Sequence, residues 1–96
     1  MPQIEVRLTE RDPSATRFRV QVHDDDGSAT EHVVTATSAD LERLESGYPS
    51  PEAFIHSCFE FLLERERKES ILRSFDVRQI STYFPEFDRT IVVTRR

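Results

Sequence analysis

Glycine, cysteine and long apolar runs are scarce in this chain, and each scarcity excludes a class of protein. Only Gly27 and Gly47 are glycine, which excludes the glycine-rich phosphate loops of P-loop and Rossmann nucleotide enzymes. The one cysteine, Cys58, excludes an internal disulfide framework and favours a reducing compartment. No apolar run approaches the roughly 20 residues of a membrane span, and residues 1–10 lack the apolar core of a signal peptide. We therefore expect a cytoplasmic protein with no membrane segment.

Positive charge is scarce in the first half of the chain. Residues 1–48 hold ten acidic and five basic side chains, a balance of −5, whereas residues 49–96 hold eight of each, so the whole chain carries −5. Binding to phosphate backbones is driven by Lys and Arg, which release counterions. Nucleic acid is therefore disfavoured as a partner. The length of 96 residues predicts a single domain over 1–96 with one modest core.

The longest periodic segment, Ser50 to Lys68, predicts a central helix. Ser50 suits the N-cap, Pro51 suits the first helical position, and Glu52 places negative charge at the positive end of the helix dipole. The apolar side chains cover an arc of roughly 200°, against roughly 100° for an ordinary surface helix, so we expect burial on two flanks. They are Phe54, Ile55, Cys58, Phe59, Phe61, Leu62 and Leu63.

Three segments of the first half have the patterns of strands. Gln3 to Thr9 and Arg17 to His23 alternate apolar with polar residues, as half-buried strands do. The acidic stretch Asp24 to Ser28 then leads into Glu31 to Thr37, which is rich in β-branched residues. The last two segments therefore predict a hairpin with an acidic loop. Another short strand is expected at Thr90 to Thr94.

Two shorter helices are expected around the central one. The first spans Ala39 to Glu45. The second begins at Asp76, because Asp76 and Gln79 have the spacing of a capping box. A hydrophobic staple between Phe75 and Ile80 supports this start, and Pro85 should end the helix near Tyr83 or Phe84.

The expected fold class is therefore α+β: a small antiparallel sheet of three or four strands with one long central helix and one or two short helices. The predicted core joins one face of the sheet to the central helix. Its members are Val6, Phe18, Val20, Val22, Phe54, Ile55, Cys58, Phe59, Leu62, Ile80 and Ile91.

Two groups on the central helix could carry chemistry. His56 and Cys58 look like a base and a nucleophile, but two positions apart on a helix they point roughly 200° away from each other. Glu52, His56 and Glu60 share one face and could supply two or three metal ligands. No second His and carboxylate element accompanies them, so a solvated face explains them better.

The predicted hairpin holds another candidate metal site. Its members are His23, Asp24, Asp26 and His32. An EF-hand loop aligned on Gly27 would place Val22 and Val33 at its first and last ligand positions, so that motif fails. An acidic turn explains the residues. We predict no catalytic residues, no cofactor and no bound metal, and little loss of stability when His23, His32 or His56 becomes alanine.

Aromatic residues are more numerous than one small sheet would be expected to cover. Seven residues are Phe, and five of them follow residue 58. Apolar surface left exposed over several hundred Å² usually marks a partner surface. We therefore predict a small non-catalytic protein-interaction module that forms a homodimer or binds another protein. The predicted interaction surface comprises Phe61, Leu63, Tyr83, Phe84 and Phe87.

The alternative prediction is an antitoxin-like or RNA-associated regulatory protein. Its nucleic-acid contacts would come from the basic concentration Arg65, Arg67, Lys68 and Arg73. Three glutamates, Glu64, Glu66 and Glu69, are interleaved with these residues. Ion pairs along a solvated helix end, such as Glu64 with Lys68, therefore account for the same pattern.

Three segments of the second half resemble parts of small uncharacterised bacterial proteins: Ser50 to Phe54, Phe61 to Glu66 and Tyr83 to Phe87. This resemblance covers about the last half of the chain and implies no activity. The order strand, strand, helix is also similar to that of antitoxins of the HicB kind. The chain has no recognisable DNA-binding tail after the domain, so the likeness is one of fold order only.

Overall fold

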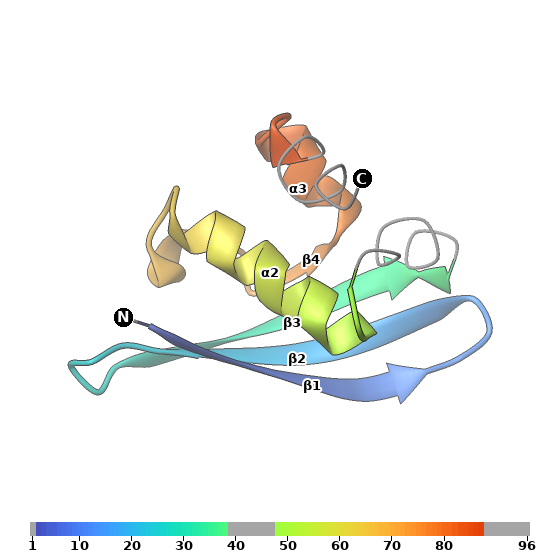
Figure 1. Cartoon of the computed structure of the whole chain (residues 1–96), viewed down its shortest axis with the longest axis horizontal. Helices are drawn as coiled ribbons and strands as arrows, with labels where there is room; N and C mark the ends of the chain where they lie inside the picture. The colour runs from blue at the N-terminus through green and yellow to red at the C-terminus, as the bar shows by residue number, and fades with distance from the viewer. Residues whose placement is uncertain (1, 39–47, 88–96) are drawn as a thin grey trace.

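Four strands form one mixed sheet in the described part of the chain, with strand order β1-β2-β3-β4. Strands β1 (Gln3–Arg11), β2 (Ala15–His23) and β3 (Ala29–Thr37) follow one another antiparallel. The short β4 (Ser74–Asp76) joins β3 in parallel. Figure 1 shows helix α2 (Pro51–Leu63) lying across this sheet. The α+β class is confirmed, but the sheet is mixed and not purely antiparallel as predicted.

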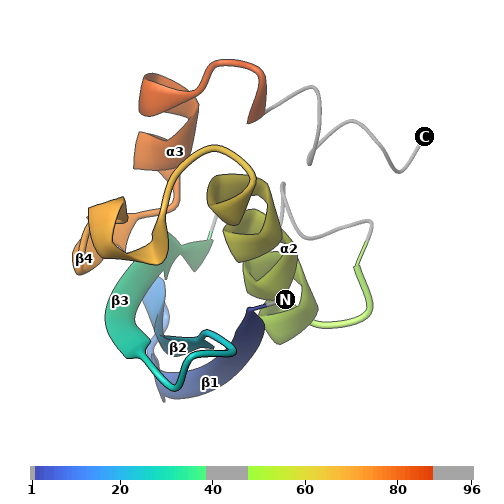
Figure 2. The same cartoon turned by 90° about the vertical axis from the view of Figure 1, so that its left-hand side faces the viewer.

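The coordinates come from a computed structural model that describes residues 2–38 and 48–87. In Figure 2 the sheet curls around α2, and the short helix α3 (Arg78–Tyr83) lies beyond α2. The sheet therefore covers one flank of the central helix, and α3 lies on another. The helix predicted over 39–45 and the strand predicted over 90–94 lie outside the described residues.

The three strands predicted within residues 3–37 are present, and each is longer than its pattern indicated. A β-bulge between Leu8 and Glu10 lets β1 continue to Arg11. The following turn is fixed by Asp12, whose carboxylate accepts hydrogen bonds from the backbone N–H groups of Ser14 and Ala15 at 3.3 and 3.0 Å. In the β2–β3 turn Gly27 has φ of +89°, a conformation that costs glycine little.

Helix α2 begins where the sequence predicted and ends earlier. Ser50 is the N-cap, and its hydroxyl accepts a hydrogen bond from the Ala53 N–H at 3.1 Å. The helix stops at Leu63 instead of Lys68, and a 3-10 turn, η1 (Lys68–Ser70), follows. Residues 64–67 are all charged, so no apolar side chain holds a further turn against the sheet. Tertiary packing supplies most of the stability of a helix in a protein.

The reciprocal side-chain bonds predicted for Asp76 and Gln79 are present, but helix α3 itself begins at Arg78, after Val77. The Asp76 N–H donates to the Gln79 side-chain oxygen at 2.9 Å, while the Asp76 carboxylate accepts from the Arg78 N–H at 2.9 Å. Phe75 and Ile80 are both buried. The helix ends at Tyr83, as predicted. The strand β4 directly before it was not predicted, since three residues are too few to show a period.

The core lies between α2 and the inner face of the sheet, and α3 extends it. Most predicted core residues are buried: Phe18, Val20, Val22, Phe54, Ile55, Cys58, Phe59, Leu62 and Ile80. Val6 is half-buried, and Ile91 lies outside the described residues. Thr16, His32 and Lys68 are the buried polar residues of the described segments.

Candidate functional site

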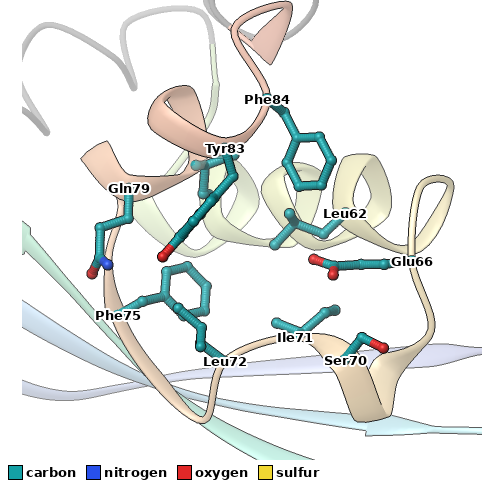
Figure 3. Close-up of a pocket in the computed structure, with 10 residues that line it drawn as sticks. Leu62, Glu66, Ser70, Ile71, Leu72, Phe75, Gln79, Tyr83 and Phe84 are labelled. Atoms are coloured by element: carbon teal, nitrogen blue, oxygen red, sulfur yellow. The ribbon is translucent and has the colours of Figure 1, made fainter.

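An open cavity of about 410 Å³ lies between the end of α2, the loop after η1, β4 and α3 (Figure 3). Its walls come from three successive stretches of the chain, all within residues 62–84. The lining residues are Leu62, Glu66, Ser70, Ile71, Leu72, Phe75, Gln79, Ile80, Tyr83 and Phe84.

The walls of the cavity are mostly apolar, and some of that surface is exposed. Leu72 and Tyr83 are 45% and 61% exposed, and they are the exposed large hydrophobic residues of the described segments. Phe84 is half-buried and contacts Phe61 edge to face, with ring centroids 6.0 Å apart. The exposed apolar surface is thus gathered at one site, the arrangement typical of a docking surface.

Glu66 places one negative charge in this apolar site. Its carboxylate points into the space between Leu62 and Ile71 (Figure 3). Burial raises the pKa of Glu66, because the charged form loses water. Within residues 2–38 and 48–87, no hydrogen bond or ion pair reaches this carboxylate. A cationic group entering the cavity would therefore give Glu66 a partner that the described residues do not supply.

The predicted interaction surface is divided by the fold. Phe61 and Phe87 are buried inside the chain, at 2% and 0% exposure, and contact each other edge to face at 5.3 Å between centroids. They are therefore core residues and cannot contribute exposed surface, because the segment after α3 folds back over α2. Leu63 is half-buried near the start of β1. Of the five predicted residues, only Tyr83 and Phe84 line the cavity.

Leu72 and Glu66 were missed as site residues. Leu72 stands in a stretch with one other apolar residue, Ile71, and the fold buries Ile71 while leaving Leu72 exposed. Glu66 looked like one member of a solvated charge pattern. Nothing in the local sequence indicates that α3 returns to this position, so neither residue carried a usable signal.

The basic residues proposed for nucleic acid are largely occupied inside the chain. Lys68 is 5% exposed and forms ion pairs with Asp24 and, at 2.8 Å, with Glu69. Hydrogen bonds to these two carboxylates raise the pKa of Lys68 to about 12. The ion pair with Asp24 ties the β2–β3 turn to η1. Lys68 is therefore a structural cation and not a surface contact.

Arg65 is also held by neighbouring groups. Its guanidinium donates to Glu86 at 3.0 Å and lies over the Phe61 ring, 3.7 Å from the centroid. Arg67 and Arg73 are exposed. The four predicted residues thus divide into two that stabilise the fold and two on the surface.

His32 lies in the core and not in the acidic turn. Its Nδ1 lies 2.8 Å from the Leu72 carbonyl oxygen and its Nε2 lies 2.8 Å from the Thr30 hydroxyl. A carbonyl can only accept, so Nδ1 carries the proton and Nε2 accepts from Thr30. Burial lowers the pKa of His32. The expectation that His32→Ala changes stability little must therefore be corrected.

The other candidate ligands are spread apart. No group of three or more His, Cys, Asp or Glu side chains in the described segments is placed to hold a metal ion. His23 faces Glu5 at 3.6 Å, and His56 faces Glu60 at 3.8 Å. Cys58 is buried, and desolvation raises the pKa of its thiol. Of the two histidines of the predicted hairpin site, only His23 therefore lies near the acidic turn.

Comparisons with known proteins give no relative: no protein-family model, curated protein or solved structure matches the chain. Among the described residues, no helix combines the length and apolar character needed to cross a membrane.

Proposed function

We propose that this protein is a cytoplasmic, non-catalytic protein-interaction module, and that the cavity beside α3 binds an apolar segment of a partner protein. The carrying observation is that the exposed Leu72 and Tyr83 both line this cavity. Apolar anchors in a pocket supply most of the affinity of a typical protein interface. The proposal therefore moves the docking surface from the predicted aromatic set to Leu72, Tyr83 and Phe84.

The charge of Glu66 specifies a second property of the partner segment. Its carboxylate is partly desolvated and has no partner within the described residues. An arginine or lysine next to the inserted apolar side chain would form a charge-assisted hydrogen bond there. The expected segment therefore combines one large apolar residue with one basic residue.

The placement of the reactive side chains supports a binding role. The Cys58 thiol is buried, and both ring nitrogens of His32 already have hydrogen-bond partners. The cavity itself contains one titratable carboxylate, Glu66, and the Tyr83 hydroxyl. Nucleophilic catalysis needs a nucleophile and a base in contact, and the described part of the cavity does not bring such a pair together.

Selection of peptides from a random library on the full-length chain tests the proposal. The expected binders carry an apolar residue beside Arg or Lys and lose affinity for Leu72→Ser and Tyr83→Ser. Glu66→Gln should keep the apolar preference and lose the basic one. Thr82→Ala is the matched control, since Thr82 is an exposed α3 residue outside the cavity. Binders that ignore both Ser substitutions would show that this cavity is not the docking surface.

A further inference from the structure

The outer edge of β1 is free in the part of the chain that the structure describes. β1 is first in the strand order and pairs only with β2. Figure 1 shows no described element beyond it. Alternate backbone N–H and C=O groups along Gln3–Arg11 therefore face outward. Such an edge is a template for another strand unless it is blocked.

We propose that β1 pairs antiparallel with β1 of a second copy of this chain, with the two-fold axis at Val6. In this register Glu5 lies opposite Arg7 of the second copy, and Arg7 lies opposite its Glu5. On the inner face Ile4 of each copy lies opposite Leu8 of the other. Opposite charges and matched apolar residues that face each other across strands each stabilise a sheet. The β1 edge is thus complementary to itself in charge and in hydrophobicity.

Neighbouring two-fold registers lack this complementarity. An axis at Arg7 sets two arginines against each other and places Ile4 opposite Glu10. An axis at Glu5 sets two glutamates against each other. A shift by a single residue in pairing would turn the apolar face outward. The alternation Glu5, Val6, Arg7 therefore selects the register centred on Val6.

The charges within one chain leave Arg7 in need of an anion. Arg7 lies directly opposite Arg19 of β2, and Arg19 pairs with Glu31 at 3.2 Å. Like charges opposite each other destabilise a sheet. No ion pair to Arg7 occurs among the described residues, and Glu5 has only His23, at 3.6 Å. Glu5 of the second copy would neutralise Arg7 on its free side.

Two further features confine the pairing to the first part of β1. The β-bulge between Leu8 and Glu10 ends the regular register, so the matched residues occupy the regular stretch from Ile4 to Leu8. Ile4, Val6 and Leu8 are half-buried under α2. A groove lined by Ile4 and Leu63 lies beside the start of β1. A second strand would cover this remaining apolar edge.

Sedimentation equilibrium of the full chain, up to millimolar concentration, tests this pairing through charge reversal. The wild-type chain should dimerise, while Glu5→Arg and Arg7→Glu should each weaken the dimer roughly tenfold or more, because both cross-strand pairs become repulsive. An equimolar mixture of the two variants should dimerise again, since every Arg then faces a Glu. Monomeric wild type, an unaffected single variant, or a mixture that stays monomeric would each overturn the proposal.

Matched controls separate this edge from other surfaces. Glu31→Arg makes the same change in the same cross-strand row, on β3, and should leave dimerisation intact. Tyr83→Ser should also leave it intact, which distinguishes this interface from the α3 cavity. After oxidation, Val6→Cys should give a cross-linked dimer and Ile4→Cys should not, because only residue 6 meets its own copy. Equal cross-linking of both variants would refute the register.

Discussion

Two regions of this molecule treat their buried polar groups in opposite ways. Where the segment after α2 crosses β3 and the β2–β3 turn, His32 and Lys68 are almost fully buried, and each has its partners in the same chain. At the α3 cavity Glu66 is partly desolvated, and the described residues give it no partner. Satisfied polar groups fix a unique fold, whereas an unsatisfied one costs free energy until a ligand arrives. The first region is therefore structural, and the second is available for binding.

The largest expected effect is that of His32→Ala. The substitution removes a buried ring beside Phe59 and leaves the Leu72 carbonyl without its donor. We expect a loss of about 2 to 4 kcal/mol in the free energy of unfolding, measured by urea denaturation. The control His23→Ala lies at the same hairpin but is 41% exposed, so its effect should be small. Equal effects of the two substitutions would remove the structural role of His32.

The same histidine should make the fold sensitive to acid. Its pKa in the folded protein is lowered from the ordinary value of 6.5, chiefly by burial. The unfolded chain therefore takes up this proton first, and stability should fall as the pH drops below 6.5. His32→Gln, which cannot be protonated, should flatten that part of the profile. An unchanged slope in the variant would assign the acid sensitivity to other groups.

The next largest effect should be that of Lys68→Met. The substitution keeps the aliphatic length but leaves Asp24 and Glu69 without their shared cation. Thermal melts at pH 7 should show a lower melting temperature, because Asp24 and Glu69 lose the charge-assisted hydrogen bonds from the Lys68 ammonium. The pKa of Lys68 is raised from its ordinary value of 10.5 to about 12, so its contribution should be complete below pH 10.5 and lost as the pH rises to about 12. Arg67→Met, at an exposed neighbour, is the control.

His32 and Lys68 also show how far the sequence predicts the fold. Alternation in Glu31 to Thr37 places His32 on the same face as Val34 and Ala36, so its burial could have been read from the period of the strand. The strands β1, β2 and β3, the Ser50 cap and the Asp76 cap are encoded by local patterns, which is why they were predicted. Lys68 meets Asp24 across 44 positions of the chain, and no local pattern reports such a contact.

The cavity was unpredictable for the same reason. The cavity depends on the position of α3 relative to α2. The buried contact between Phe61 and Phe87 fixes that position. Counting aromatic residues indicated a surplus but could not show that most of it is used inside the chain. Leu72 and Tyr83 are the large hydrophobic residues that this packing leaves exposed among the described segments.

The smallest expected effect, that of Glu66→Gln, tests the binding side of the comparison. Burial raises the pKa of Glu66 in the folded chain above its ordinary value of 4.5. The charged form therefore costs stability at neutral pH, and this cost fades as the pH falls through the folded-state pKa. Removing the charge should stabilise the free protein by a few tenths of a kcal/mol at pH 7, because the group is partly exposed.

The matched control for Glu66 is Glu69→Gln, three positions along the chain. Lys68 lowers the pKa of Glu69, so the same chemical change should lower stability at pH 7. The two variants should therefore shift the melting temperature in opposite directions at neutral pH and converge on the wild type under acid conditions, where both carboxylates are protonated. If Glu66→Gln instead lowered the melting temperature at pH 7, its carboxylate would have a partner within the chain. The cavity would then belong with the satisfied region and would not be available to a basic ligand.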